Sequence, residues 1–104
     1  MQARLVHMLQ EVVGMQLYCM RLAQLHQKGE LNDTIASLAK LNNTSKARQI
    51  CLDARDMLGG NGILLENHVI RHLVDVEAIH TYEGTETIQT LLVGRDITGV
   101  GAFA

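Results

Sequence analysis

The sequence has no proline and no tryptophan, and its aromatic side chains are limited to Tyr18, Tyr82 and Phe103. A β-sandwich would show more aromatic residues and more turn signals, so this fold class is disfavoured. Nearly half of the 104 residues are apolar, and most of these are Leu, Ile, Val, Met and Ala. This composition is typical of a helical protein, and a chain of this length can form one domain with one modest core.

The chain also lacks an excess of either charge and any long apolar run. Its formal net charge is −2 with acids and bases interspersed, which gives no electrostatic reason to expect nucleic acid or a membrane surface as a partner. No run approaches the roughly 20 apolar residues of a membrane span. The N-terminus alternates polar and apolar residues, unlike a signal peptide. We therefore expect a soluble, intracellular protein.

Cysteine is scarce as well. Cys19 and Cys51 are too few and too far apart to predict a disulfide framework or a zinc knuckle. A free cysteine on an apolar helix face is usually a reduced core thiol, and we expect this of both. Met8, Met15 and Met20 are interpreted in the same way, as residues that fill the core.

What the sequence does contain is helical periodicity. Apolar residues recur at steps of three and four over Gln2 to Gln27, which predicts one long amphipathic helix. Lys28 then supplies a basic last turn and Gly29 a C-terminal glycine. Asn32 or Asp33 offers a side-chain oxygen that can cap the next helix.

The second helix is predicted to continue to Leu58, where Gly59-Gly60-Asn61-Gly62 ends it. Shorter helices are expected from Glu66 to about Val76 and from about Thr85 to Ile97. The fold class is therefore all-α, an up-and-down helical bundle without a β-sheet. Helices of roughly 25 residues are about 38 Å long, longer than a compact domain of this size shields. We expect part of their apolar surface to meet protein outside this chain.

The sharpest local feature is Glu83-Gly84, which stands directly before a predicted helix. A connector there places backbone N–H groups and a positive dipole end toward a ligand, and the glycine permits close approach. The alternative is an ordinary loop glutamate with Thr85 as N-cap, and spacing alone favours it. The glycines after Leu58 are a second candidate for phosphate or cofactor contact. They do not match G-x-G-x-x-G, so a plain helix-terminating turn is favoured.

The histidines give little support for a metal site. His68 and His72 stand four residues apart on a predicted helix, with Glu66 and His80 nearby in sequence. The residue after His68 is Val69, so the glutamate of H-E-x-x-H is missing and we predict no metal. His7 and His26 are interpreted as partly exposed residues of the first helix.

Taken together, three segments resemble the C-terminal domain of acyl-CoA dehydrogenases. They are Ala54-Arg55-Asp56-Met57-Leu58-Gly59-Gly60-Asn61-Gly62-Ile63, His68-Val69-Ile70-Arg71-His72 and Thr81-Tyr82-Glu83-Gly84-Thr85. The stretches Ser37-Leu38-Ala39-Lys40, Asn42-Asn43 and Gly94-Arg95-Asp96-Ile97-Thr98-Gly99 look most like the glutaryl-CoA dehydrogenase branch. Residues 1–104 would then form a partial C-terminal α-helical domain, about the last quarter of a family member, without the first helix of its bundle.

The resemblance implies roles for residues at matching positions. Glu83 would remove the α-proton of an acyl-CoA thioester while a hydride leaves the β-carbon for FAD, and its backbone N–H would help hold the thioester carbonyl. Gly84 would abut the substrate, and Thr85 and Thr87 would lie against the flavin. The residues expected to reach the FAD of a neighbouring subunit are Asp56, Met57, Leu58, Gly59 and Gly60. Phe103 would pack near FAD at the C-terminus.

The resemblance also implies partners and a location. These are an acyl-CoA substrate, electron-transfer flavoprotein and copies of the same chain in a dimer or tetramer. The compartment would be the bacterial cytoplasm, or the mitochondrial matrix in a eukaryote. The sequence departs from the family pattern where Glu86 precedes Thr87, which moves the acid by one position, and where His80 replaces a common asparagine. The alternative function is a non-catalytic helical oligomerisation or interaction module from a truncated or excised chain.

Overall fold

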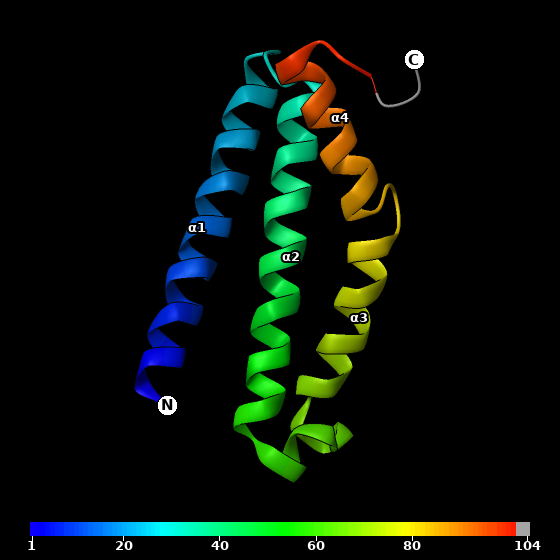
Figure 1. The fold of residues 1–104 in the computed structure, drawn as a ribbon. Helices are drawn as coiled ribbons and strands as arrows, with labels where there is room; N and C mark the ends of the chain where they lie inside the picture. Colours follow the sequence, from blue (N-terminus) through cyan, green and yellow to red (C-terminus); the bar gives the residue numbers. More distant parts are fainter. Residues whose placement is uncertain (102–104) are drawn as a thin grey trace.

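The computed structural model describes residues 1–101, and within them the chain forms four α-helices, two short 3-10 helices and no β-strand (Figure 1). The long helices are α1 (Gln2–Gln27) and α2 (Asp33–Met57), and the shorter ones are α3 (Val69–Thr81) and α4 (Glu86–Thr98). Helix α2 packs against the other three, while α3 and α4 run back along it one after the other. The all-α, up-and-down architecture is confirmed.

The turn between α1 and α2 follows the sequence signals. Gly29 has φ +71°, a left-handed conformation that favours glycine after a helix. Asn32 is the N-cap of α2, and its Oδ1 accepts a hydrogen bond of 2.9 Å from the backbone N–H of Ile35. This bond satisfies one of the N–H groups that the first helical turn leaves without an intrahelical acceptor.

The predicted bounds of the third helix are wrong, because two 3-10 helices, η1 (Gly59–Ile63) and η2 (Leu65–Asn67), precede it. His68 follows with φ 66°, which interrupts helical geometry, so α3 begins at Val69. The side chain of Asn67 donates a 2.9 Å hydrogen bond to the Asn61 carbonyl and ties the two turns together. At its other end α3 continues to Thr81, since no glycine occurs between Val69 and Gly84.

The core is small. Among residues 1–101, the buried apolar side chains are those of Leu25, Ala39, Leu73 and Val76. The interpretation of Met20 and Cys19 as core residues is wrong for this chain, because Met20 is 59% exposed and Cys19 is also exposed. Both line an open apolar hollow between α1, α2 and α3, where the side-chain nitrogen of Asn43 lies 3.5 Å from the sulfur of Cys19.

Cys51 fits the expected pattern more closely. It is partly buried on α2, and burial raises the pKa of its thiol. The neutral form is therefore favoured, which agrees with an unreactive thiol. Within the described residues, no helix is both long and apolar enough to cross a bilayer.

The exposed apolar face of α1 leads to a prediction about the isolated chain. Leu9 is 63% exposed and Leu17 is 59% exposed, and an apolar hollow of about 800 Å³ opens between α1, α2 and α3. An apolar surface this extensive is characteristic of a protein-protein contact. Sedimentation at micromolar concentration is expected to show species larger than a monomer. A single monomeric species would contradict this prediction.

Candidate functional site

The candidate site is the connector between α3 and α4. Helix α3 ends at Thr81, and Thr85 caps α4 by accepting a 3.3 Å hydrogen bond from the N–H of Ile88. Between them Glu83 has φ 57° and Gly84 has φ +98°. Glu83 therefore lies on a short connector, as expected, and in a left-handed conformation that is uncommon for a residue with a side chain.

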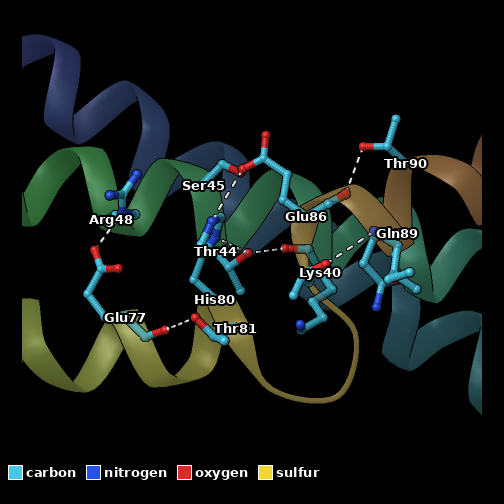
Figure 2. Close-up of polar contacts among 12 residues, drawn as sticks. Lys40, Thr44, Ser45, Arg48, Glu77, His80, Thr81, Glu86, Gln89 and Thr90 are labelled. Atoms are coloured by element: carbon cyan, nitrogen blue, oxygen red, sulfur yellow. Dashed lines mark hydrogen bonds and ion pairs between the residues drawn. The ribbon is translucent and has the colours of Figure 1, made fainter.

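Side chains from two helices bind the carbonyl groups of this connector. Lys40 on α2 donates to the carbonyl of Tyr82 at 2.6 Å and also to that of Gly84. Gln89 on α4 donates to the carbonyls of Glu83 at 3.1 Å and Gly84 at 3.4 Å. Figure 2 shows Lys40 on α2 and Gln89 on α4. Within residues 1–101 the N–H of Glu83 makes no hydrogen bond, so this donor faces no competitor inside the chain.

Gly84 is required by the same geometry. A side chain there would place its Cβ 2.5 Å from the amide nitrogen of Gln89, and its positive φ is one that L side chains rarely adopt. Sequence reasoning noted Gly84 but missed Lys40 and Gln89 as site residues. Lys40 occurs within a motif that carries the family resemblance, but helical spacing alone cannot show that it reaches a connector 42 residues away. Gln89 lies on the first turns of the helix that follows the connector, and its type alone does not show that its side chain folds back onto the carbonyls of Glu83 and Gly84.

The connector separates two hollows. Glu83 is exposed and lines one of about 410 Å³, and Thr85 and Thr87 line another of about 480 Å³. The residues that share the first with Glu83 are Asp33, Thr34, Ala36, Ser37, Lys40, Gln89, Leu92, Arg95 and Asp96. The second also contains His80, Thr81, Glu86, Thr90 and Leu91. The expected base and the expected flavin contacts are thus adjacent in sequence but line different hollows.

The two positions that depart from the family pattern contact each other. His80 Nε2 lies 3.3 Å from a carboxylate oxygen of Glu86, and the same oxygen accepts a hydrogen bond from Ser45 at 3.4 Å (Figure 2). The other ring nitrogen of His80 lies 3.4 Å from the Thr44 hydroxyl. Glu86 therefore has partners on α2 and α3 and is directed away from the hollow that Glu83 lines.

The segment from Asp56 to Gly60 lies far from the connector. Along α2, Asp56 is roughly 24 Å from Lys40 at 1.5 Å per residue, and Figure 1 shows this segment at one end of the bundle, whereas α4 starts partway along it. Asp56 accepts a 3.0 Å hydrogen bond from Arg4, which raises the pKa of that guanidinium. Gly59 and Gly60 have open space where a side chain would stand, so a ligand can approach their backbone.

The structure confirms that α2 ends where the Gly59-Gly60-Asn61-Gly62 motif begins, and this motif also has a packing role. Gly59 has φ +60°, and α2 stops at Met57. Gly62 is buried, and a Cβ there would overlap the carbonyl oxygen of Arg55. The third glycine of this motif therefore allows η1 to pack against the last turn of α2.

The remaining sequence candidates fall outside this arrangement. His68 precedes α3, so the expectation that it shares a helix with His72 is wrong. Within residues 1–101, no three His, Cys, Asp or Glu side chains gather in a metal-binding arrangement. Phe103, expected near FAD, lies outside the described residues.

Comparison with known families shows which family the chain belongs to. The family model for the acyl-CoA dehydrogenase C-terminal domain matches residues 1–98. The chain belongs to the acyl-CoA dehydrogenase family. A curated member, cyclohexane-1-carbonyl-CoA dehydrogenase from Geobacter metallireducens, is 35% identical over 77 residues, which are 74% of this chain and 20% of that protein.

Solved acyl-CoA dehydrogenase structures resemble the chain closely. A crystal structure of glutaryl-CoA dehydrogenase from Mycobacterium smegmatis is 41% identical with a TM-score of 0.95. A glutaryl-CoA dehydrogenase structure from the same organism, in complex with FADH2, is 35% identical with a TM-score of 0.94. Each match covers 99% of this chain but 27% of the other. The chain thus spans about a quarter of these neighbours and a fifth of the curated relative.

Proposed function

We propose that this chain is the C-terminal part of an FAD-dependent acyl-CoA dehydrogenase of the glutaryl-CoA type, with Glu83 as the base. The observation that carries the proposal is the α3–α4 connector, where Glu83 is held in a left-handed conformation with its N–H unused within residues 1–101. Family membership supplies the reaction class, α,β-dehydrogenation of an acyl-CoA thioester.

The proposed chemistry at Glu83 is removal of the α-proton. A carboxylate serves as a base when a dry pocket brings its pKa toward the working pH, and closure of the rest of the protein over a thioester would exclude water from the hollow beside Glu83. The free N–H of Glu83 would hold the thioester carbonyl oxygen as negative charge develops there. Gly84, which has no side chain, would let the thioester approach the backbone.

The residues present also fit FAD. Thr85 and Thr87 line an open hollow at the start of α4, where hydroxyl and backbone N–H donors can bind a flavin edge. Gly59 and Gly60 present bare backbone, and Asp56, Met57 and Leu58 precede them at the other end of α2. These two groups of residues lie far apart in the chain. Their separation suits an arrangement in which two copies contact each FAD, one through Thr85 and Thr87 and the other through the Asp56 to Gly60 segment. When bound, FAD would accept the hydride from the substrate β-carbon.

The substrate and the partners are the finer part of the proposal. The two glutaryl-CoA dehydrogenase structures support a glutaryl-CoA substrate, with decarboxylation following the dehydrogenation. Electron-transfer flavoprotein would reoxidise the flavin. A dimer or tetramer would bring the Asp56 to Gly60 segment of one copy to the FAD of another.

A second candidate function is a non-catalytic helical interaction module. The exposed apolar face of α1 favours it, because such a face can bind another protein without any flavin chemistry. The coding sequence upstream separates the two candidates. Roughly 250 or more in-frame codons of acyl-CoA dehydrogenase sequence would support the enzyme, and an in-frame stop would support the module.

The isolated chain gives a second test of how the site is assembled. We expect that the isolated 104-residue chain does not bind FAD tightly and shows no dehydrogenase turnover, because both groups of proposed flavin contacts are open on one side. Equilibrium dialysis with FAD, followed by an acyl-CoA assay with an artificial electron acceptor, would measure both. A yellow protein that retains FAD through dialysis would show that the chain contains far more of the site than proposed.

A further inference from the structure

Lys40 is placed to control the geometry of the proposed base through contacts with the connector backbone. It lies on α2 beside the buried residues Ser37 and Ala39, and its side chain reaches the α3–α4 connector. Its ammonium group donates to the carbonyls of Tyr82 and Gly84, the residues immediately before and after Glu83. The same nitrogen lies 5.9 Å from the centroid of the Tyr82 ring, within cation-π range.

The connector needs such contacts because its backbone conformation is unfavourable. Glu83 at φ 57° is one of two non-glycine residues with positive φ among residues 1–101, and Gly84 at φ +98° follows it. A residue in this region keeps its conformation only when the surrounding structure determines it. The last hydrogen bond of α3 runs from the N–H of Tyr82 to the carbonyl of Ala78, and Thr85 caps the start of α4. Between these two points, the hydrogen bonds to the connector backbone come from side chains.

Gln89 supplies the complementary contact from α4. It is 6% exposed, and its amide nitrogen donates to the carbonyls of Glu83 and Gly84. Its amide oxygen has no partner, and rotating the amide would turn that oxygen against the two carbonyl oxygens. The carbonyls of Tyr82, Glu83 and Gly84 are therefore held by donors from two helices, and Lys40 alone binds on both sides of Glu83.

We propose that Lys40 is a positioning residue for Glu83. This inference rests on the proposed function, since it assumes that Glu83 is the base. By binding the peptide group before Glu83 and the peptide group that follows Gly84, the Lys40 ammonium helps to set the direction in which the Glu83 carboxylate leaves the backbone. A base must lie within hydrogen-bond reach of the proton that it removes, so a displacement of about 1 Å slows the reaction by up to ~100-fold.

The test uses Lys40→Met in the full-length protein, because methionine retains an unbranched apolar stem and removes the charged donor. We expect FAD content and the acyl-CoA dissociation constant to stay within about twofold of wild type. Flavin reduction at saturating substrate should slow by roughly 10- to 100-fold. This separation of rate from binding would not follow from a general loss of folded protein. Lys40→Arg keeps charged donors and should reduce its flavin at an intermediate rate.

Lys46→Met is the matched control. Lys46 lies on the same helix but pairs with Glu11 of α1 at 3.4 Å, away from the connector. We expect this variant to reduce its flavin within about twofold of wild type. Wild-type flavin reduction in Lys40→Met would overturn the inference. So would a fall in rate that only parallels a loss of bound FAD, because Lys40 would then be a general fold residue.

Glu83→Gln, measured alongside, separates this inference from the proposed function. If Glu83→Gln is slow and Lys40→Met is not, Glu83 remains the base and the role of Lys40 is wrong. If Glu83→Gln reduces its flavin at the wild-type rate, the base itself has been misassigned, whatever Lys40→Met does.

Discussion

Glu83→Gln in the full-length protein should retain FAD and bind acyl-CoA, yet reduce its flavin roughly 10²- to 10⁴-fold more slowly than wild type. This is the range that loss of a positioned general base costs. The amide keeps the size of the side chain but accepts no proton at the working pH. The carbonyl contacts of the connector come from Lys40 and Gln89 and do not involve the Glu83 carboxylate, so the local backbone should persist.

Glu86→Gln and Glu77→Gln are the controls for this result. Glu86 contacts Ser45 and His80, and Glu77 pairs with Arg48, so both carboxylates already have partners outside the hollow that Glu83 lines. Their substitution should change flavin reduction less than about tenfold, below the usual contribution of a general base. Anaerobic rapid mixing with acyl-CoA would measure all three variants. Slow reduction in Glu86→Gln with a wild-type rate in Glu83→Gln would mean that the shifted acid is the base.

Gly62→Ala should cause a large loss of stability in the isolated chain. The new Cβ would overlap the Arg55 carbonyl oxygen and lie 3.0 Å from the carbonyl carbon, so backbone must move. Overpacking of this kind costs about 1–3 kcal/mol, and a chain of this length loses roughly 4–8 °C in melting temperature per kcal/mol. Thermal unfolding followed by circular dichroism should therefore show a midpoint lower by roughly 5–20 °C.

Gly60→Ala is the matched control, two residues away in the same turn. Its Cβ would meet nothing within 4 Å and its φ lies outside the positive range, so the melting temperature should hardly change. Because Gly60 is also a proposed FAD contact, the same substitution could impair the full-length protein without destabilising the isolated chain. Equal melting temperatures for the wild type, Gly60→Ala and Gly62→Ala would show that η1 does not pack on α2 as described.

Much of the fold could be predicted because its signals are local. The spacing of apolar residues predicts α1 and α2, and Asn32 and Thr85 are caps whose side chains bond to backbone within the same turn. The predicted start of the third helix is too early, because His68 has a positive φ and interrupts the helical geometry. Histidine is enriched among the few non-glycine residues with positive φ, but one histidine is too weak a signal to fix the start of a helix.

The candidate site was predictable only in part. Glu83, Gly84 and Thr85 are contiguous, so a motif can identify them and the cap of α4 fixes their place. The contribution of Lys40 depends on a contact with Tyr82 across 42 residues, which no local pattern reports. Gln89 is close in sequence, but its contacts with Glu83 and Gly84 depend on the conformation of the connector. The same reason explains Met20 and Cys19. Periodicity places Cys19 on an apolar face of the first helix, and residue type favours the core for Met20, but neither signal says whether this chain covers them.

Hydrogen exchange at the substrate α-carbon tests the central claim most directly, because it isolates proton removal from hydride transfer. The full-length protein, with its flavin reduced beforehand, would be incubated with glutaryl-CoA in D₂O, and deuterium at the α-carbon followed by mass spectrometry. Our account predicts that the wild type catalyses deuterium incorporation. Glu83→Gln, with FAD and substrate bound, should incorporate deuterium at least about 100-fold more slowly. Incorporation at the wild-type rate in Glu83→Gln would contradict the assignment of Glu83 as the base.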